Sequence, residues 1–240
     1  MHQLQESKEL SDQHLLEYLK TSPYESVRLE AFLLLQQRHS DDFVSAIENA
    51  ADDNFELLQR FAVNALIKNG DPRLANTLAG KLCDVNTSAR VAFNALQGTQ
   101  FFSRQNLLPA VEDRLRQVAP YVVQPETYAK GVLKNAENYA GRWNEEIEKL
   151  CKGEMSHKRA LTQINFMRIY CPPYLLPQVA GYAATLKDDE LLLPLLEALG
   201  WHRQAYTSAQ VVPVVEKLMK DTSHSEQVRQ EALKTYKRLK

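Results

Sequence analysis

A nine-residue frame recurs along the chain and constrains its fold more than any other feature. Segments 27–35, 58–66 and 88–96 read VRLEAFLLL, LQRFAVNAL and SARVAFNAL, so that alanine holds the fifth position and leucine the ninth in all three. Segments 191–199 and 228–236 fit the same frame. A small residue at mid-helix lets neighbouring helices approach closely, and a period of 30 to 45 residues is typical of stacked helical repeats.

Helix-breaking residues recur along the chain at intervals that fit the same repeat. Asp-, Asn-, Gly- and Pro-rich breaks such as Asn69-Gly70-Asp71-Pro72 separate helical segments, and no series of strand-like alternating runs is found. The breaks predict an all-α chain of about twelve helices, or about six antiparallel helix pairs. We expect a single repeat domain over residues 1–240, with regular repeats at about 12–100 and 188–240 and an irregular middle at about 103–172.

The pattern Val-Arg-x-x-Ala-x-x-Ala-Leu, preceded by Asp/Asn-rich turns, resembles the second helix of HEAT repeats, in particular those of the PBS-lyase type. The resemblance covers the first hundred and the last fifty residues well and is poor between Ser103 and Pro172. It implies a right-handed α-α superhelix, a HEAT-like solenoid, in which the second helices line a concave surface. It implies little about function, because one fold hosts many activities.

Composition is that of an ordinary globular protein, with 44% hydrophobic residues, 25% charged residues and a formal net charge of -1. Apolar runs such as 191–196 fall far short of the roughly 20 residues that span a bilayer, so we expect no membrane insertion. No basic segment followed by an apolar run opens the sequence, and a cytoplasmic location is expected. The alternative of an accessory domain cut from an exported protein stays open.

Signatures of catalysis are absent from the sequence. It has no Gly-x-Ser-x-Gly, no His-Glu-x-x-His and no glycine-rich phosphate loop. Cys83, Cys151 and Cys171 are widely spaced and the six histidines stand singly, which does not match the clustered ligands of a zinc site. We therefore predict that the chain is not an enzyme and has no catalytic residues, no cofactor and no metal. Acidic pairs such as Asp52-Asp53 and Asp188-Asp189 are expected to cap helices.

Two sets of residues are candidates for contact with a partner. The third and seventh frame positions, four apart and thus on one helix face, are Arg60 and Asn64 in one repeat and Arg90 and Asn94 in the next. The resemblance would place them on the concave surface; the competing interpretation is a solvated helix face.

Trp143 and Trp201 belong to an aromatic-rich second half of the chain. Tryptophan is common at binding hot spots, although such residues also seal irregular repeat junctions.

The leading interpretation is a non-catalytic protein–protein interaction scaffold or accessory binding domain that holds a protein or peptide on its concave face. The alternative is a nucleic-acid-binding module similar to the HEAT-like alkylpurine DNA glycosylases, although a pI of about 6.6 makes a nucleic-acid partner unfavourable. A chromophore-lyase-like protein rests on fold resemblance alone. Residues 1–56 carry 12 acidic and 4 basic side chains against 18 and 25 in the remainder, so self-association through opposite charge is also open.

Overall fold

The structure is a computed structural model that describes residues 10–140 and 143–240, with side chains described as far as residue 137 before the gap. Within these ranges all regular structure is helical and no strand is present. The fourteen α-helices are α1 (Asp12–Thr21), α2 (Glu25–Arg38), α3 (Phe43–Ala51), α4 (Glu56–Asn69), α5 (Ala75–Cys83), α6 (Ala89–Gly98), α7 (Arg104–Val118), α8 (Pro125–Ala140), α9 (Trp143–Cys151), α10 (His157–Met167), α11 (Leu176–Thr185), α12 (Asp189–Gly200), α13 (Ser208–Lys220) and α14 (Glu226–Leu239).

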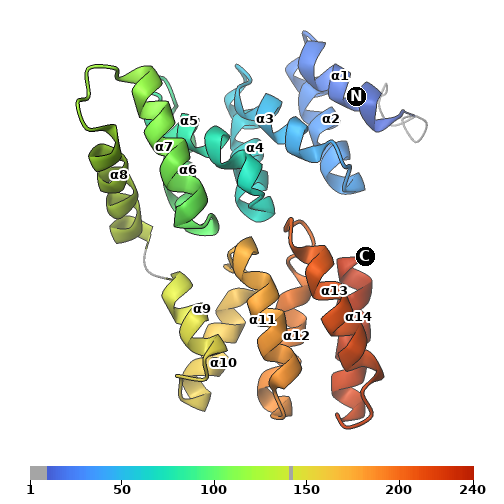
Figure 1. Ribbon diagram of the computed structural model, residues 1–240. Coiled ribbons are helices and arrows are strands. Elements are labelled where there is room, and N and C mark those ends of the chain that lie inside the picture. The colour runs from blue at the N-terminus through green and yellow to red at the C-terminus, as the bar shows by residue number, and fades with distance from the viewer. Residues whose placement is uncertain (1–9, 141–142) are drawn as a thin grey trace. The chain divides into compact units, whose positions relative to one another are not determined.

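Consecutive helices pack against one another as pairs, which confirms the predicted all-α fold class. The contacts join α1 to α2, α5 to α6, α11 to α12 and α13 to α14 (Figure 1). The described residues form more helices than the roughly twelve that the breakers predict.

Helices also stack on the next helix but one, as expected when repeats lie side by side. Helix α1 contacts α3, α5 contacts α7, α11 contacts α13, and α12 contacts both α10 and α14. Each layer thus covers the apolar face that a single pair leaves open. The order holds through α10 and α11, inside or next to the segment whose sequence matches the frame poorly.

The chain divides into two compact units by its contacts. Unit 1 comprises Met1–Ile67, Asp71–Thr99 and Arg104–Ala136, and unit 2 comprises Lys68–Gly70, Gln100–Ser103 and Glu137–Lys240. The single domain expected from the sequence stays a prediction.

The repeat frame marks the core in the first, second and fourth matches. Ala31, Phe32 and Leu35 are fully buried in α2, and Ala62, Val63 and Leu66 are equally buried in α4. In α12, all the leucines at the corresponding positions are buried, namely Leu191, Leu195, Leu196 and Leu199. An alanine flanked by larger apolar residues therefore does form the seam between layers.

The third match is displaced by three residues. In α6 the buried side chains are Val91 and Ala95, whereas Phe93 is 43% exposed. Ser88, the first residue of the predicted frame, lies outside the helix, where its hydroxyl accepts the N–H of Val91 at 3.4 Å as the N-cap. The buried frame in α6 therefore begins at Val91. Its fifth position is Ala95, which corresponds to Ala62 in α4.

Acidic residues at two of the turns accept backbone N–H groups, and one of them caps a helix. Asp188 caps α12 by accepting the N–H of Glu190 at 2.9 Å. Asp53 accepts the N–H of Phe55 and also holds the Arg28 guanidinium, which comes from another helix. Among the described residues, no helix is long and apolar enough to cross a membrane.

Candidate functional site

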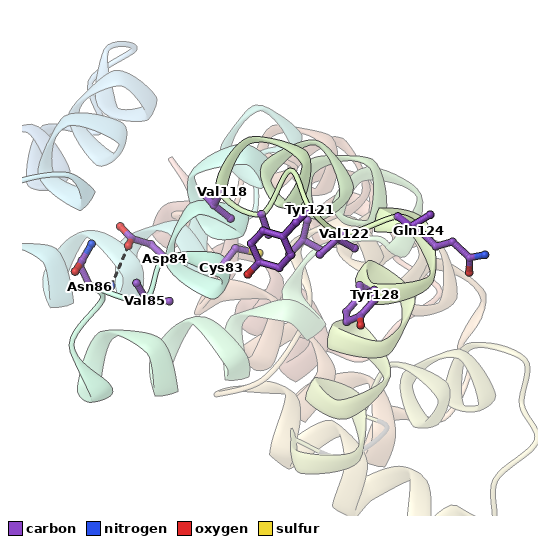
Figure 2. A pocket seen from close by; sticks show the side chains of 12 residues that line it. Cys83, Asp84, Val85, Asn86, Val118, Tyr121, Val122, Gln124 and Tyr128 are labelled. Atoms are coloured by element: carbon purple, nitrogen blue, oxygen red, sulfur yellow. Dashed lines mark hydrogen bonds between the residues drawn. The ribbon is translucent and has the colours of Figure 1, made fainter.

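A pocket of about 800 Å³ lies in unit 1, between the loop that joins α5 to α6 and the segment that joins α7 to α8. Figure 2 shows Val85 and Asn86 on the first of these loops and Tyr121, Val122 and Gln124 on the second segment, with Tyr128 on α8. The volume lies within the range of small-molecule sites, which is about 300 to 1,000 Å³. The lining residues are Cys83, Asp84, Val85, Asn86, Leu115, Val118, Ala119, Tyr121, Val122, Val123, Gln124 and Tyr128.

One wall follows from how α5 ends. The helix stops at Cys83, and the carboxylate of Asp84 accepts the backbone N–H of Asn86 over 2.9 Å, a turn that aspartate forms readily. The carbonyl of Asp84 accepts the N–H of Thr87 over 3.1 Å. Two consecutive bonds to one residue hold Val85 at the tip of the turn, where its side chain is 96% exposed.

The other wall follows from how α7 ends and α8 begins. The N–H of Ala119 still donates to the carbonyl of Leu115, and the N–H of Val122 then donates to Ala119, each over 2.9 Å. Pro125 restarts the chain as the first residue of α8, where its fixed φ is already helical and its missing N–H costs nothing. The segment between the two helices therefore has a defined path.

Large apolar side chains on these loops are unusually exposed. Tyr121 is 82% exposed, Val123 is 92% exposed and Tyr128 is 61% exposed. A single exposed apolar residue is ordinary, but a cluster of them around a concavity marks a binding site more often than a bare surface.

Electrostatics of the pocket are simple, because Asp84 is the one charged residue among the twelve that line it. Burial raises the pKa of the Cys83 thiol, and the nearby Arg114 lowers it by a smaller amount. The thiol is therefore protonated at neutral pH and is a poor nucleophile. The arrangement favours binding of an apolar molecule over covalent chemistry at Cys83.

The predicted Arg/Asn pairs lie elsewhere in unit 1. Nδ2 of Asn94 donates to Oδ1 of Asn64 at 3.4 Å, so the two asparagines of neighbouring repeats do meet. Arg60 is partly buried, with no hydrogen-bond partner for Nε, whereas Arg90 is exposed in the first turn of α6. Because the third frame begins at Val91, Arg60 and Arg90 do not occupy equivalent positions.

Both predicted tryptophans lie on unit 2 and are partly exposed. Trp143 stacks on Phe166 with ring centroids 4.3 Å apart, and Phe166 stacks on Tyr170 at 4.9 Å. Trp201, which is 61% exposed, lies under the guanidinium of Arg238 at 5.5 Å.

None of the six predicted residues lines the pocket. The pocket is formed by loops, and its signal in the sequence is the run Tyr121-Val122-Val123 between Pro120 and Pro125. Apolar residues confined between two prolines cannot continue a helix and are too few for a buried strand. Such a run indicates an exposed apolar loop, although on its own it does not show which other loop it meets.

Comparisons with known proteins give little further information. No family model matches the chain, and no curated protein matches it. A solved structure of human deoxyhypusine hydroxylase in complex with glycerol is similar over 94% of this chain and 96% of its own, at 16% sequence identity and a TM-score of 0.33.

That similar chain is named as an enzyme, which contradicts two expectations from the sequence. The interpretation as a non-catalytic scaffold and the prediction that the chain is not an enzyme are both withdrawn. Absence of a contiguous signature does not exclude catalysis, because catalytic groups are often brought together from distant parts of a chain. With this identity and TM-score, the likeness assigns no activity or substrate to the present protein.

Proposed function

We propose that this protein binds an uncharged or positively charged organic molecule with an apolar, ring-containing body in the pocket of unit 1. The observation that carries the proposal is the pocket itself, with Tyr121 and Tyr128 exposed at its wall. A bound apolar ring would cover both tyrosine rings, and their hydroxyls would still reach water or a polar edge of the ligand.

The charge of the ligand follows from the lining. Anionic ligands are ordinarily held by arginine or lysine, and the lining contains neither a basic side chain nor a histidine. Helix α8 starts at the pocket wall, but its first residue is Pro125, which has no N–H to offer an anion. The carboxylate of Asp84 favours a cation, and tyrosine rings attract cations through their faces. A phosphate- or carboxylate-bearing ligand is therefore disfavoured in this pocket.

The test uses three fluorescent probes that share one aromatic body and carry a neutral, a cationic or an anionic substituent. We expect saturable binding of the neutral and cationic probes. The double variant Tyr121→Ala/Tyr128→Ala should bind them about tenfold more weakly, since it removes two aromatic contacts. Titrations followed by fluorescence anisotropy measure these affinities directly.

Tyr24→Ala is the matched control, because Tyr24 is also in unit 1, is 69% exposed and does not line the pocket. Its affinities should equal those of the unchanged protein. The proposal would be refuted if Tyr24→Ala lost as much affinity for the probes as Tyr121→Ala/Tyr128→Ala. Tightest binding of the anionic probe would also refute it.

Other assignments remain proposals with specific support. The HEAT-like identity is supported by the buried alanine frame in α2 and α4 and by stacking of alternate helices. A protein or peptide partner is compatible with the pocket if it presents aromatic or cationic side chains, and the cytoplasmic location stays an expectation. A partner-binding role for Arg60, Asn64, Arg90, Asn94, Trp143 and Trp201 also stays a prediction.

A further inference from the structure

A cluster in unit 2 brings together one imidazole and two carboxylates. His157 is the first residue of α10, Asp188 is the N-cap of α12, and Glu190 lies in the first turn of α12. Helices α10 and α12 pack directly against each other, which places the three side chains at one end of a helix pair. His157 is about thirty residues from Asp188 and Glu190 in the sequence, so the cluster does not form a contiguous motif.

The distances suit a shared metal ion. Nε2 of His157 lies 3.1 Å from Oδ2 of Asp188 and 3.5 Å from Oε2 of Glu190, and all three atoms lie within 4.8 Å of one another. A zinc ion at its usual bond lengths of about 2.0 to 2.2 Å keeps neighbouring ligand atoms about 3.0 to 3.5 Å apart. Two of the three separations match, and the exposed Glu190 side chain is free to close the third.

The orientation of one ligand is already fixed. Oδ1 of Asp188 accepts the N–H of Glu190 at 2.9 Å, and the other oxygen of the same carboxylate faces His157. A carboxylate held by a hydrogen bond loses less freedom when it binds a metal.

Charge gives an independent argument. Oxygens of the Asp188 and Glu190 carboxylates lie beside Nε2 of His157, so the cluster gathers two full negative charges that a bound cation would offset. The N-termini of α10 and α12 carry positive partial charge and disfavour a cation, but two full negative charges exceed them. The net charge of the cluster therefore attracts a metal ion.

We propose that His157, Asp188 and Glu190 bind one divalent transition-metal ion. A mixed nitrogen and oxygen ligand set favours zinc, cobalt or manganese over calcium and magnesium, which prefer oxygen alone. Three protein ligands on an exposed surface leave coordination positions to water. The proposal differs from the expectation of no metal, which stays untested, and is independent of the pocket in unit 1.

The test is a titration of the tag-free protein with zinc by calorimetry and with cobalt by absorption spectroscopy. We expect one ion per chain and a cobalt spectrum without a thiolate charge-transfer band. His157→Ala and Glu190→Gln should each weaken metal binding about tenfold or more. Loss of a residue that only hydrogen-bonds to a metal ligand already lowers metal affinity by about that factor, and loss of the ligand itself should lower it at least as much. Asp188 is left unchanged, because it also caps α12.

The matched control is His14→Ala, which removes an exposed histidine from α1 in unit 1. It should bind zinc and cobalt as the unchanged protein does, and circular dichroism should show equal helicity in all variants. Absence of one-to-one binding, equal affinity in His157→Ala and the unchanged protein, or a thiolate band would overturn the proposal. In the first two cases the cluster would be a surface contact between a histidine and two carboxylates.

Discussion

At the scale of single residues, the most informative contact is a buried ion pair that the repeat frame did not predict. Nε of Arg28 donates to Oδ2 of Asp53 over 2.7 Å and Nη2 donates to Oδ1 over 2.8 Å, with both side chains about nine-tenths buried. Nη1 of Arg28 also donates to the carbonyl of Ser22. Arg28, at the second frame position, thus ties α2 to the turn that precedes α4.

Replacement of Asp53 by alanine should destabilise unit 1 by about 3 kcal/mol, because the Arg28 charge would be left buried without a partner. Urea denaturation measures the change. The control is Asp113→Ala, which breaks the exposed Arg116–Asp113 pair and should cost at most about 0.5 kcal/mol. A similar small loss in both variants would contradict the stabilising role assigned to the buried pair.

His202 in unit 2 predicts a pH dependence of stability. Burial lowers the pKa of His202, and its hydrogen bond from Nε2 to the carbonyl of Met167 at 2.6 Å acts in the opposite direction. The unfolded chain therefore binds a proton at higher pH than the folded chain does. Stability from this residue is complete above about pH 6.5 and falls as the pH drops from there toward the folded-state pKa.

The measurement is the free energy of unfolding between pH 5 and pH 7.5, compared with that of His202→Gln. We expect the unchanged protein to lose stability below about pH 6.5 and the variant to show a flatter profile. Parallel profiles for the two proteins would show that His202 does not cause the loss.

At the scale of helices, the close approach of α4, α5 and α6 depends on one glycine. A Cβ at Gly98 would lie 2.9 Å from Cγ1 of Ile67 and 3.4 Å from Cδ1 of Leu78, so both neighbours press on the last residue of α6. At Gly80, in α5, a Cβ would meet nothing within 4 Å. Packing therefore leaves no room for a side chain at Gly98, whereas there is room for one at Gly80.

Gly98→Ala should therefore destabilise unit 1 by about 1 to 3 kcal/mol, because overpacking outweighs the better helix propensity of alanine. Gly80→Ala should stabilise it by up to about 1 kcal/mol. Thermal melting of the two variants checks the opposite signs. Stabilisation by both substitutions would show that the Ile67 side chain can move away from the added methyl group without loss of stability.

Periodicity predicted the helices well and the register less well. Alanines are frequent enough in 88–96 that the frame fits both at Ser88 and three residues later, and the hydroxyl cap of α6 decides between the two. Arg90 differs in register from Arg60 for the same reason, and its partner-binding role stays a prediction.

At the scale of the whole molecule, the regular layers could be predicted and the sites could not. The pocket brings together two loops, after Cys83 and after Val118, and the metal-binding cluster joins the starts of two helices. Helix starts and loops follow no period, so their meeting in space depends on how the layers stack. Residues on the periodic helix faces, such as Asn64 and Asn94, were easier to predict but lie outside the pocket.

The central claim, that the pocket of unit 1 binds a neutral or cationic apolar ligand, is tested most directly at Cys83. Alkylation of Cys83 and Cys151 is followed by mass spectrometry at alkaline pH, because burial raises both thiol pKa values, that of Cys151 to about 11. A saturating neutral or cationic probe should slow alkylation of Cys83, which lines the pocket, and leave that of Cys151 in unit 2 unchanged. An unchanged rate at Cys83, or an equal slowing at both cysteines, would contradict the account.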